Sequence, residues 1–164
     1  MDRIVVHTDG ACWPNNGRGT GGWAFVAEWG VRRVTRHGFE RPSTNNRMEL
    51  MAVVRALQYV RLTAHPLVVR TDSMYVFNAL TAWGARWRRF GWRTSAGEPV
   101  KNRELIEPAL ALIERHRTVR QIDLEWVKGH AGDKGNEHAD RLSVIARQQC
   151  TTTWTENCAR VDVG

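Results

Sequence analysis

The chain has 164 residues, of which 42% are hydrophobic and 25% are charged, and its formal net charge at pH 7 is +7. This composition predicts one globular domain and excludes a mainly disordered chain. No apolar run approaches the roughly 20 residues of a membrane-spanning helix, and the first residues lack a signal peptide's apolar stretch, so we expect a soluble, cytoplasmic protein.

The first quarter of the chain predicts three strands. Residues 3–9 are apolar and β-branched and indicate a strand, whereas residues 10–22, rich in Gly, Asn and Pro, indicate a loop. Two more strands are expected at 22–28 and 31–37, with Gly30 as the turn between them. Together these three strands would form an antiparallel meander.

Helices and strands then alternate. Residues 45–62 follow a helical period, with an apolar stripe at Val53, Leu57 and Val60. The later elements are expected to be a strand at 67–71, a helix from Ser73 to about Leu80, a helix at 102–117, a strand at 121–127 and a helix at 135–147.

This order predicts an α/β fold with a mixed sheet and helices on both faces. The two later strands would join the antiparallel meander in parallel, through helical crossovers. Periodicity ends at Gln148, so we expect one folded domain at 1–147 and a tail at 148–164.

Four carboxylates occupy positions that solubility does not explain. Asp9 closes the first strand and Asp72 the fourth, and ligand sites of α/β sheets gather at strand ends. Glu49 shares a helix face with Val53, and Asp140 lies beside an apolar stripe at 139, 142 and 145 in the last helix.

Each acid alone has an ordinary explanation: a turn at 9, an arginine ion pair at 49, a helix cap at 72 or a solvated helix surface at 140. If the four converge, however, they repel one another unless protons or a metal ion neutralise them. Oxygen ligands of this kind favour Mg²⁺ or Mn²⁺.

Four strings surround these acids: Thr8-Asp9-Gly10, Asn45-Asn46-Arg47-Met48-Glu49-Leu50, Thr71-Asp72-Ser73, and Trp126-Val127-Lys128-Gly129-His130-Ala131-Gly132 followed by Asn136-Glu137 and Asp140. A single string is a weak signal. All four, in this order, resemble the type 1 ribonuclease H family, the bacterial ribonuclease HI group, over roughly residues 2–147.

The resemblance implies a ribonuclease H-like fold with a five-stranded mixed sheet. It also implies an endoribonuclease, expected to be a monomer, that cuts the RNA strand of RNA–DNA hybrids and leaves 5′-phosphate and 3′-hydroxyl ends. Asp9, Glu49, Asp72 and Asp140 match the family's catalytic carboxylates, which would hold two Mg²⁺ ions, with Mn²⁺ possible. His130 matches the histidine of a mobile loop, for which we expect proton transfer.

Residues 73–97 contain no acidic residue but several tryptophans and arginines. This segment resembles the basic protrusion of bacterial members, which would hold the hybrid, although the tryptophans could instead form a small satellite core. The residues expected to bind substrate are Cys12, through its backbone, and Asn15, Asn45, Asn46, Trp83, Trp87, Arg88, Arg89, Trp92 and Lys101.

Two positions depart from the family pattern, because Met74 and Arg86 stand where many or some relatives have Gln and Asn. Three other functions compete with hybrid cleavage: a DNA nuclease on the same fold, a hybrid-binding module without catalysis and a basic structural protein. The glycine-histidine loop and the basic segment disfavour the first. Four intact carboxylates disfavour the second, and Glu49 disfavours the third.

Overall fold

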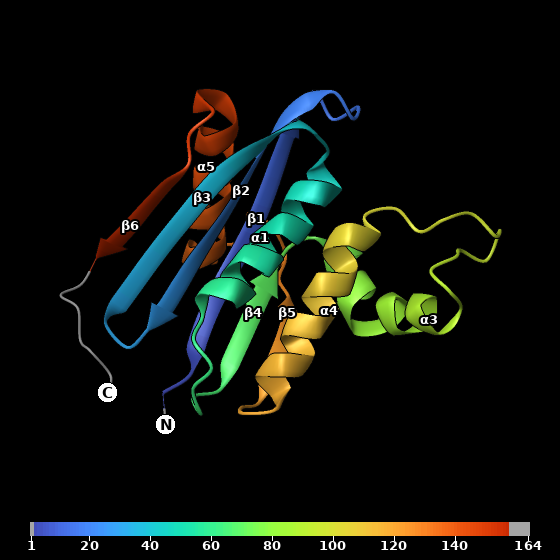
Figure 1. The fold of residues 1–164 in the computed structure, drawn as a ribbon. Coiled ribbons are helices and arrows are strands. Elements are labelled where there is room, and N and C mark those ends of the chain that lie inside the picture. The colour runs from blue at the N-terminus through green and yellow to red at the C-terminus, as the bar shows by residue number, and fades with distance from the viewer. Residues whose placement is uncertain (1, 158–164) are drawn as a thin grey trace.

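The computed structural model describes residues 2–157 and consists of one twisted sheet with helices on both faces (Figure 1). The strands are β1 (Ile4–Trp13), β2 (Gly19–Trp29), β3 (Arg32–Ser43), β4 (Leu67–Thr71), β5 (Ile122–Trp126) and β6 (Thr153–Asn157). Their order in the sheet is β5-β4-β1-β2-β3-β6. The antiparallel meander β1-β2-β3 and the parallel addition of β4 and β5 confirm the expected five-stranded mixed sheet.

The helices are α1 (Asn45–Tyr59), α2 (Met74–Asn78), the π-helical segment η1 (Ala79–Trp83), α3 (Gly84–Arg89), α4 (Arg103–Arg117) and α5 (Lys134–Gln149). α1 and α4 cover one face of the sheet, and α5 lies on the other (Figure 1). α2, η1 and α3 follow one another without a break, and α3 projects away from the sheet. Among the residues that the structure describes, no helix has the length and apolar character to cross a membrane.

The main core lies between the sheet and α1. The predicted stripe Val53, Leu57 and Val60 is buried there, against strand residues such as Val6 and Phe25. Thr44 caps the helix, because its side chain accepts a hydrogen bond from the backbone N–H of Arg47 at 3.2 Å. This core fixes the start of α1, where Glu49 lies.

The buried face of α5 differs from the expected one. Its buried residues are small or polar: Gly135, Asn136, Ala139, Ser143 and Ala146. Ile145, expected in the apolar stripe, is 37% exposed. Small side chains are needed because α5 lies close to the sheet, where a Cβ at Gly22 would fall 2.0 Å from the Ser143 carbonyl oxygen.

β1 continues beyond the predicted strand, so the expectation of a loop over residues 10–22 is wrong at both of its ends. The pairing of β1 with β2 runs without interruption through Asp9↔Ala24 and Cys12↔Gly21 to Trp13↔Thr20. Cross-strand hydrogen bonds hold these residues extended, although their side chains show no apolar alternation. Asp9 therefore lies within a strand and not at its end.

β6 was not expected from the sequence, which predicts only a tail after Gln148. Its backbone pairs antiparallel with the outer edge of β3, from His37↔Thr153 to Arg33↔Asn157. A threonine-rich segment carries no alternating apolar signal, so the available edge of β3, and not the segment's own pattern, decides this pairing. The rest of the expected tail, 158–164, lies outside the described residues.

Candidate active site

Three of the four predicted carboxylates converge. Asp9 on β1, Glu49 on α1 and Asp72, the residue directly after β4, each offer a carboxylate oxygen, and these oxygens lie within 4.8 Å of one another. Asp140 on α5 is close enough that its charge helps to raise the pKa of both Asp9 and Asp72. Three segments that are distant in sequence thus bring their carboxylates together, and Asp140 lies near enough to influence them.

Asp9 is only 4% exposed. Burial raises the pKa of its carboxyl to about 7, and the negative charges of Asp72 and Asp140 add to the increase. The Ser143 hydroxyl opposes it by donating a hydrogen bond to Asp9 Oδ2 at 2.7 Å. A carboxylate in this position is costly to ionise unless a cation lies beside it.

Glu49 reaches the site because α1 lies directly against β1. A Cβ on Gly10 would fall 2.3 Å from the Glu49 backbone nitrogen, so only glycine permits this contact. Glu49 is 9% exposed, and burial, followed by the charges of Asp9 and Asp72, raises its pKa well above the usual value. Its Oε2 atom is buried and has no hydrogen-bond partner among the described residues.

Asp72 is held by the loop that follows β5. A Cβ on Gly129 would fall 2.8 Å from Asp72 Oδ2, and the Trp126 indole N–H donates to the Asp72 carbonyl oxygen at 3.1 Å. Burial raises the pKa of Asp72, whereas the Asn136 side chain and His130 lower it. The loop and the start of α5 therefore pack directly on the site.

His130 is exposed within this loop and has a left-handed backbone conformation with φ 55°. The preceding residue, Gly129, packs against Asp72 Oδ2, and His130 lowers the pKa of that carboxyl. Gly132, two residues later, also has a positive φ of 89°. The backbone thus turns sharply on both sides of Ala131, and this turn presents the histidine to solvent beside the acids.

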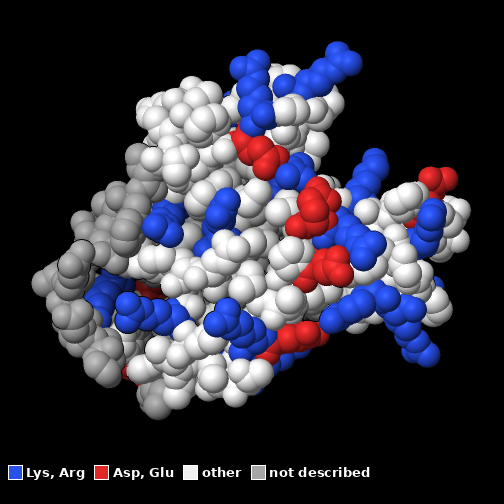
Figure 2. Space-filling view, viewed as in Figure 1, with Lys and Arg blue, Asp and Glu red and all other residues white. Residues whose placement is uncertain are grey.

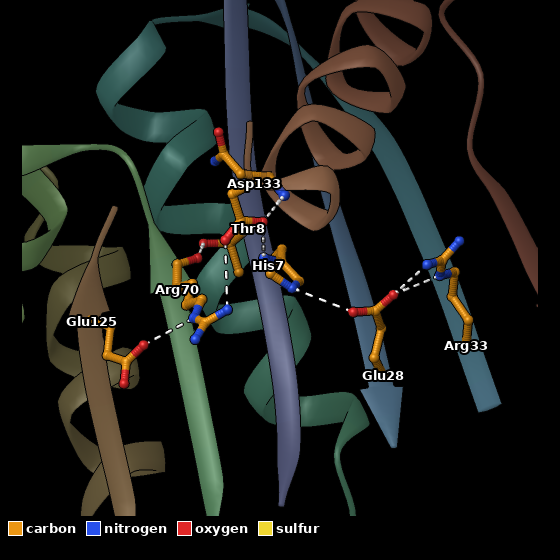
Figure 3. Close-up of polar contacts among 8 residues, drawn as sticks. His7, Thr8, Glu28, Arg33, Arg70, Glu125 and Asp133 are labelled. Atoms are coloured by element: carbon orange, nitrogen blue, oxygen red, sulfur yellow. Dashed lines mark hydrogen bonds and ion pairs between the residues drawn. The ribbon is translucent and has the colours of Figure 1, made fainter. Parts of the chain in front are cut away.

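A row of charged side chains, interrupted by His7, whose pKa is lowered chiefly by burial, crosses the sheet beneath the start of α5 (Figure 3). His7 lies between Glu28, at 3.5 Å, and Asp133, at 3.2 Å. Arg70 lies between Glu125, at 2.9 Å, and Asp133, at 3.5 Å. Asp133 also caps α5, accepting from the Asn136 backbone N–H at 2.9 Å. The row therefore secures the helix that carries Asp140.

Three of the residues expected to bind substrate, near the start of α1, are joined by hydrogen bonds. The Cys12 backbone N–H donates to Asn45 Oδ1 at 2.6 Å, and the Asn45 backbone N–H donates to Asn15 Oδ1 at 2.9 Å. Cys12 is buried, whereas Asn15 and Asn46 are exposed. The Cys12 backbone therefore orients the Asn45 side chain, and the Cys12 N–H is already hydrogen-bonded within the protein.

The tryptophans predicted to bind substrate occupy different environments. The rings of Trp83 and Trp87 are 5.7 Å apart, and Trp83 is 40% exposed. Trp92 is only 7% exposed and belongs to the core, with the Arg103 guanidinium 5.0 Å from its ring. The indole of Trp92 therefore packs inward, as expected from the alternative in which the tryptophans form a core and not a binding surface.

The cations of this protruding segment are accessible. Arg88, Arg89 and Lys101 are all exposed, although Arg88 also pairs with Glu114 at 2.9 Å. Figure 2 shows basic side chains around this projecting part of the molecule. The segment thus offers a basic surface with an exposed indole face.

The carboxylate cluster fits a divalent cation. All donor atoms are carboxylate oxygens, the type that Mg²⁺ and Mn²⁺ prefer. The pKa values of Asp9, Glu49 and Asp72 are all raised, chiefly by burial and further by the charges of neighbouring acids, so a cation would favour their ionised form. A cation between them would also supply the missing partner of Glu49 Oε2.

The sequence alone predicts no role for two residues that contact these acids, although Asn136 belongs to one of the four strings. Asn136 is 2% exposed and lies against Asp72, and Ser143 is fully buried against Asp9. The signal that could have revealed Ser143 is its spacing from Ala139 and Ala146, which places all three residues on one helix face. A single hydroxyl on such a face needs a buried partner.

Comparison with known sequences gives a consistent result. A family model described as RNase H matches residues 1–149. The ribonuclease H of Xanthomonas oryzae pv. oryzae is 47% identical over 151 residues, covering 92% of this chain and 94% of the relative. The ribonuclease H of Maricaulis maris is 43% identical over 143 residues, covering 87% and 92%.

Solved structures agree. The crystal structure of LC9-RNase H1, described as a type 1 RNase H with the type 2 active-site motif, matches with a TM-score of 0.81 at 28% identity, over 96% of this chain and 78% of that one. A foamy viral protease-reverse transcriptase in complex with RNA/DNA hybrid matches 90% of this chain, and this chain covers 20% of it. Its TM-score is 0.76 at 18% identity, which is a likeness of fold.

Proposed function

The chain belongs to the ribonuclease H family, and from this membership we propose that it hydrolyses the RNA strand of RNA–DNA hybrids, leaving 5′-phosphate and 3′-hydroxyl ends. The observation that carries the proposal is the convergence of Asp9, Glu49 and Asp72, with Asp140 beside them. Burial and repulsion disfavour the ionised form of Asp9, Glu49 and Asp72, and holding cations would explain why these acids are placed together.

The cations proposed are two Mg²⁺ ions, with Mn²⁺ as a substitute, held by Asp9, Glu49, Asp72 and Asp140. Divalent ions bound to such a group supply activation of the attacking water and stabilisation of the leaving 3′-oxygen. The protein's own contribution is to hold the carboxylates in place, whereas the cations would favour their ionised form. Gly10 and Gly129 allow the close approach of Glu49 and of the loop against Asp72.

His130 has a separate role in the proposal. An imidazolium nitrogen at the exposed loop position would donate a proton to the departing 3′-oxygen and then take up another proton from solvent. The exposure of His130 and its closeness to Asp72 support this assignment. The role needs a side chain that reaches both the site and bulk water.

Two surfaces would hold the hybrid. Asn15, Asn45 and Asn46 would face the minor groove, where 2′-hydroxyls distinguish RNA from DNA. The protruding segment would meet the phosphates with Arg88, Arg89 and Lys101, and offer Trp83 and Trp87 to sugar or base faces. Within this assignment Cys12 acts through Asn45, and Trp92 stabilises the segment from inside.

We propose that one copy of the chain suffices for activity, because all four acids and both binding surfaces belong to a single polypeptide. Sedimentation of the active protein at assay concentration should therefore give the mass of a monomer. Loss of specific activity on dilution would contradict this part of the proposal.

The deciding experiment is cleavage of a strand-labelled RNA–DNA hybrid, beside single-stranded RNA, duplex RNA and duplex DNA, each with Mg²⁺ or EDTA. The expected result is Mg²⁺-dependent cutting of RNA in the hybrid alone, with 5′-phosphate ends detected by phosphatase sensitivity. The Asp9→Asn variant, purified identically, controls for contaminating nuclease. Hybrid binding without cutting would instead identify a binding module, and cutting of duplex DNA would identify a different nuclease on this fold.

A further inference from the structure

Ser143 is a buried hydroxyl on α5, three residues after Asp140. Its Oγ atom lies 2.7 Å from Asp9 Oδ2 and 2.9 Å from the Asp140 carbonyl oxygen. A hydroxyl has one proton to donate, and an ionised carboxylate is the stronger acceptor. The shorter contact is also to Asp9, so the proton is directed at Asp9.

The short serine side chain spans from helix to strand because α5 lies unusually close to β2. A Cβ on Gly22 would fall 2.0 Å from the Ser143 carbonyl oxygen and 2.6 Å from the Arg147 nitrogen. Gly22 therefore allows the helix to approach at the turn where Ser143 stands. Ala139 and Ala146 lie on the same buried face and bring no hydroxyl to it.

We propose that Ser143 is a positioning residue that fixes the orientation of the Asp9 carboxylate for a divalent cation, an inference that rests on the proposed function. The hydrogen bond restrains rotation of the carboxyl group by holding Oδ2. It also joins β1 to α5, so that Asp9 and Asp140 keep a fixed spacing. Hydrogen-bond partners of metal ligands act in this way, and their loss weakens metal affinity about 10- to 100-fold.

The test measures Mn²⁺ binding to the full chain without nucleic acid, by the electron paramagnetic resonance signal of free Mn²⁺. Ser143→Ala removes the hydroxyl and almost nothing else, and should weaken Mn²⁺ binding about tenfold or more. Ser143→Cys restores a weak donor of similar size and should lie between the two. In hybrid cleavage, Ser143→Ala should need more Mg²⁺ for half-maximal rate and recover much of its rate at saturating Mg²⁺.

Ala146→Gly is the matched control, since it loosens the same buried helix face without touching Asp9. It should lower the melting temperature yet leave Mn²⁺ affinity unchanged. Ser143→Ala affinity within twofold of wild type, in a wild-type protein that binds Mn²⁺ and cleaves, would overturn this inference alone. An equal loss in Ala146→Gly would also overturn it, and a wild-type protein that binds no Mn²⁺ would overturn the proposed function as well.

Discussion

The backbone of Gly10 touches the first turns of α1 at Glu49, where a Cβ would fall 2.3 Å from the Glu49 nitrogen. Two acids from different elements, Asp9 and Glu49, are neighbours because of this contact. Backbone cannot yield as a flexible side chain can, so the fold depends on glycine at this position.

Gly10→Ala should therefore destabilise the protein by about 3 kcal/mol and abolish most hybrid cleavage, because the added methyl group pushes α1 from β1. Chemical denaturation and the cleavage assay would measure the two effects. Gly30→Ala is the control: nothing lies within 4 Å of its Cβ, and only a φ of 57° opposes alanine. It should cost about 1 kcal/mol and retain activity. Equal losses in the two variants would contradict the packing argument.

Asp9→Asn should remove most cleavage while hybrid binding persists, and in metal-free protein it should increase stability at alkaline pH. The pKa of Asp9 rises from 3.8 to about 7 on folding, so the folded state holds a proton that the unfolded state has lost. The wild-type protein therefore loses stability as pH rises from about 4 to about 7.

The Asp9→Asn variant has no ionisable group at this position, so its folding stability does not fall in this way. Above about pH 8 it should be more stable than the wild-type protein by about 2 to 4 kcal/mol, given roughly 1.4 kcal/mol per pKa unit. Below about pH 3, where the carboxyl is protonated in both the folded and the unfolded state, the difference should vanish. Urea denaturation with EDTA across this pH range measures it. A constant difference at every pH would show that the effect is not electrostatic.

His130→Ala should lower kcat about 10- to 100-fold at neutral pH without abolishing cleavage, because water can replace the imidazole less efficiently. KM for the hybrid should change little, since the exposed side chain is not part of the binding surfaces proposed above. His65→Ala removes a histidine outside the site and should behave as wild type. Unchanged turnover in His130→Ala would exclude it from the mechanism.

Replacing Arg86, Arg88 and Arg89 together by Ala should weaken hybrid binding and flatten its salt dependence. Each lost phosphate contact should reduce the slope of log K against log salt by about 1. The charge-matched control is Arg61, Arg115 and Arg117 to Ala, at the far ends of α1 and α4. Equal slopes in the two triple variants would contradict a binding role for the protruding segment.

Asp133→Ala should destabilise the protein by about 1 to 2 kcal/mol, because it removes the cap of α5 and its contacts with His7 and Arg70. Asp133→Asn keeps a capping oxygen but lacks the charge, and should cost less. The difference between the variants, measured by denaturation, reports the contribution of the charged row. Equal costs would show that only the cap matters.

Much of the site can be predicted from the sequence, because the patterns that indicate its residues lie within short segments. Asp72 follows an apolar strand, Glu49 interrupts an apolar helix face, and the resemblance of the last motif to the family indicates Asp140 and His130. The structure confirms the strand order and brings Asp9, Glu49 and Asp72 together. These features follow from patterns within short segments, because the order of helices and strands along the chain restricts how the strands can be arranged in a sheet.

What the sequence does not predict depends on contacts between distant segments. The extension of β1 to Trp13 follows from its pairing with β2, and the inward packing of Trp92 follows from the core beneath it. The Ser143 bond to Asp9 joins residues 134 positions apart. No local period encodes such contacts, because they arise only when helix and sheet are packed.

β6 occupies the outer edge of β3, a row of backbone amides and carbonyls that would otherwise face solvent between residues 33 and 37. Unpaired edges of this kind invite pairing with a second chain. β6 covers this row of β3 and becomes the outer strand in its place, so the open edge of the sheet moves from β3 to the segment after α5. A change in this segment would therefore alter how readily the sheet edge pairs with a second chain, without touching the carboxylate cluster.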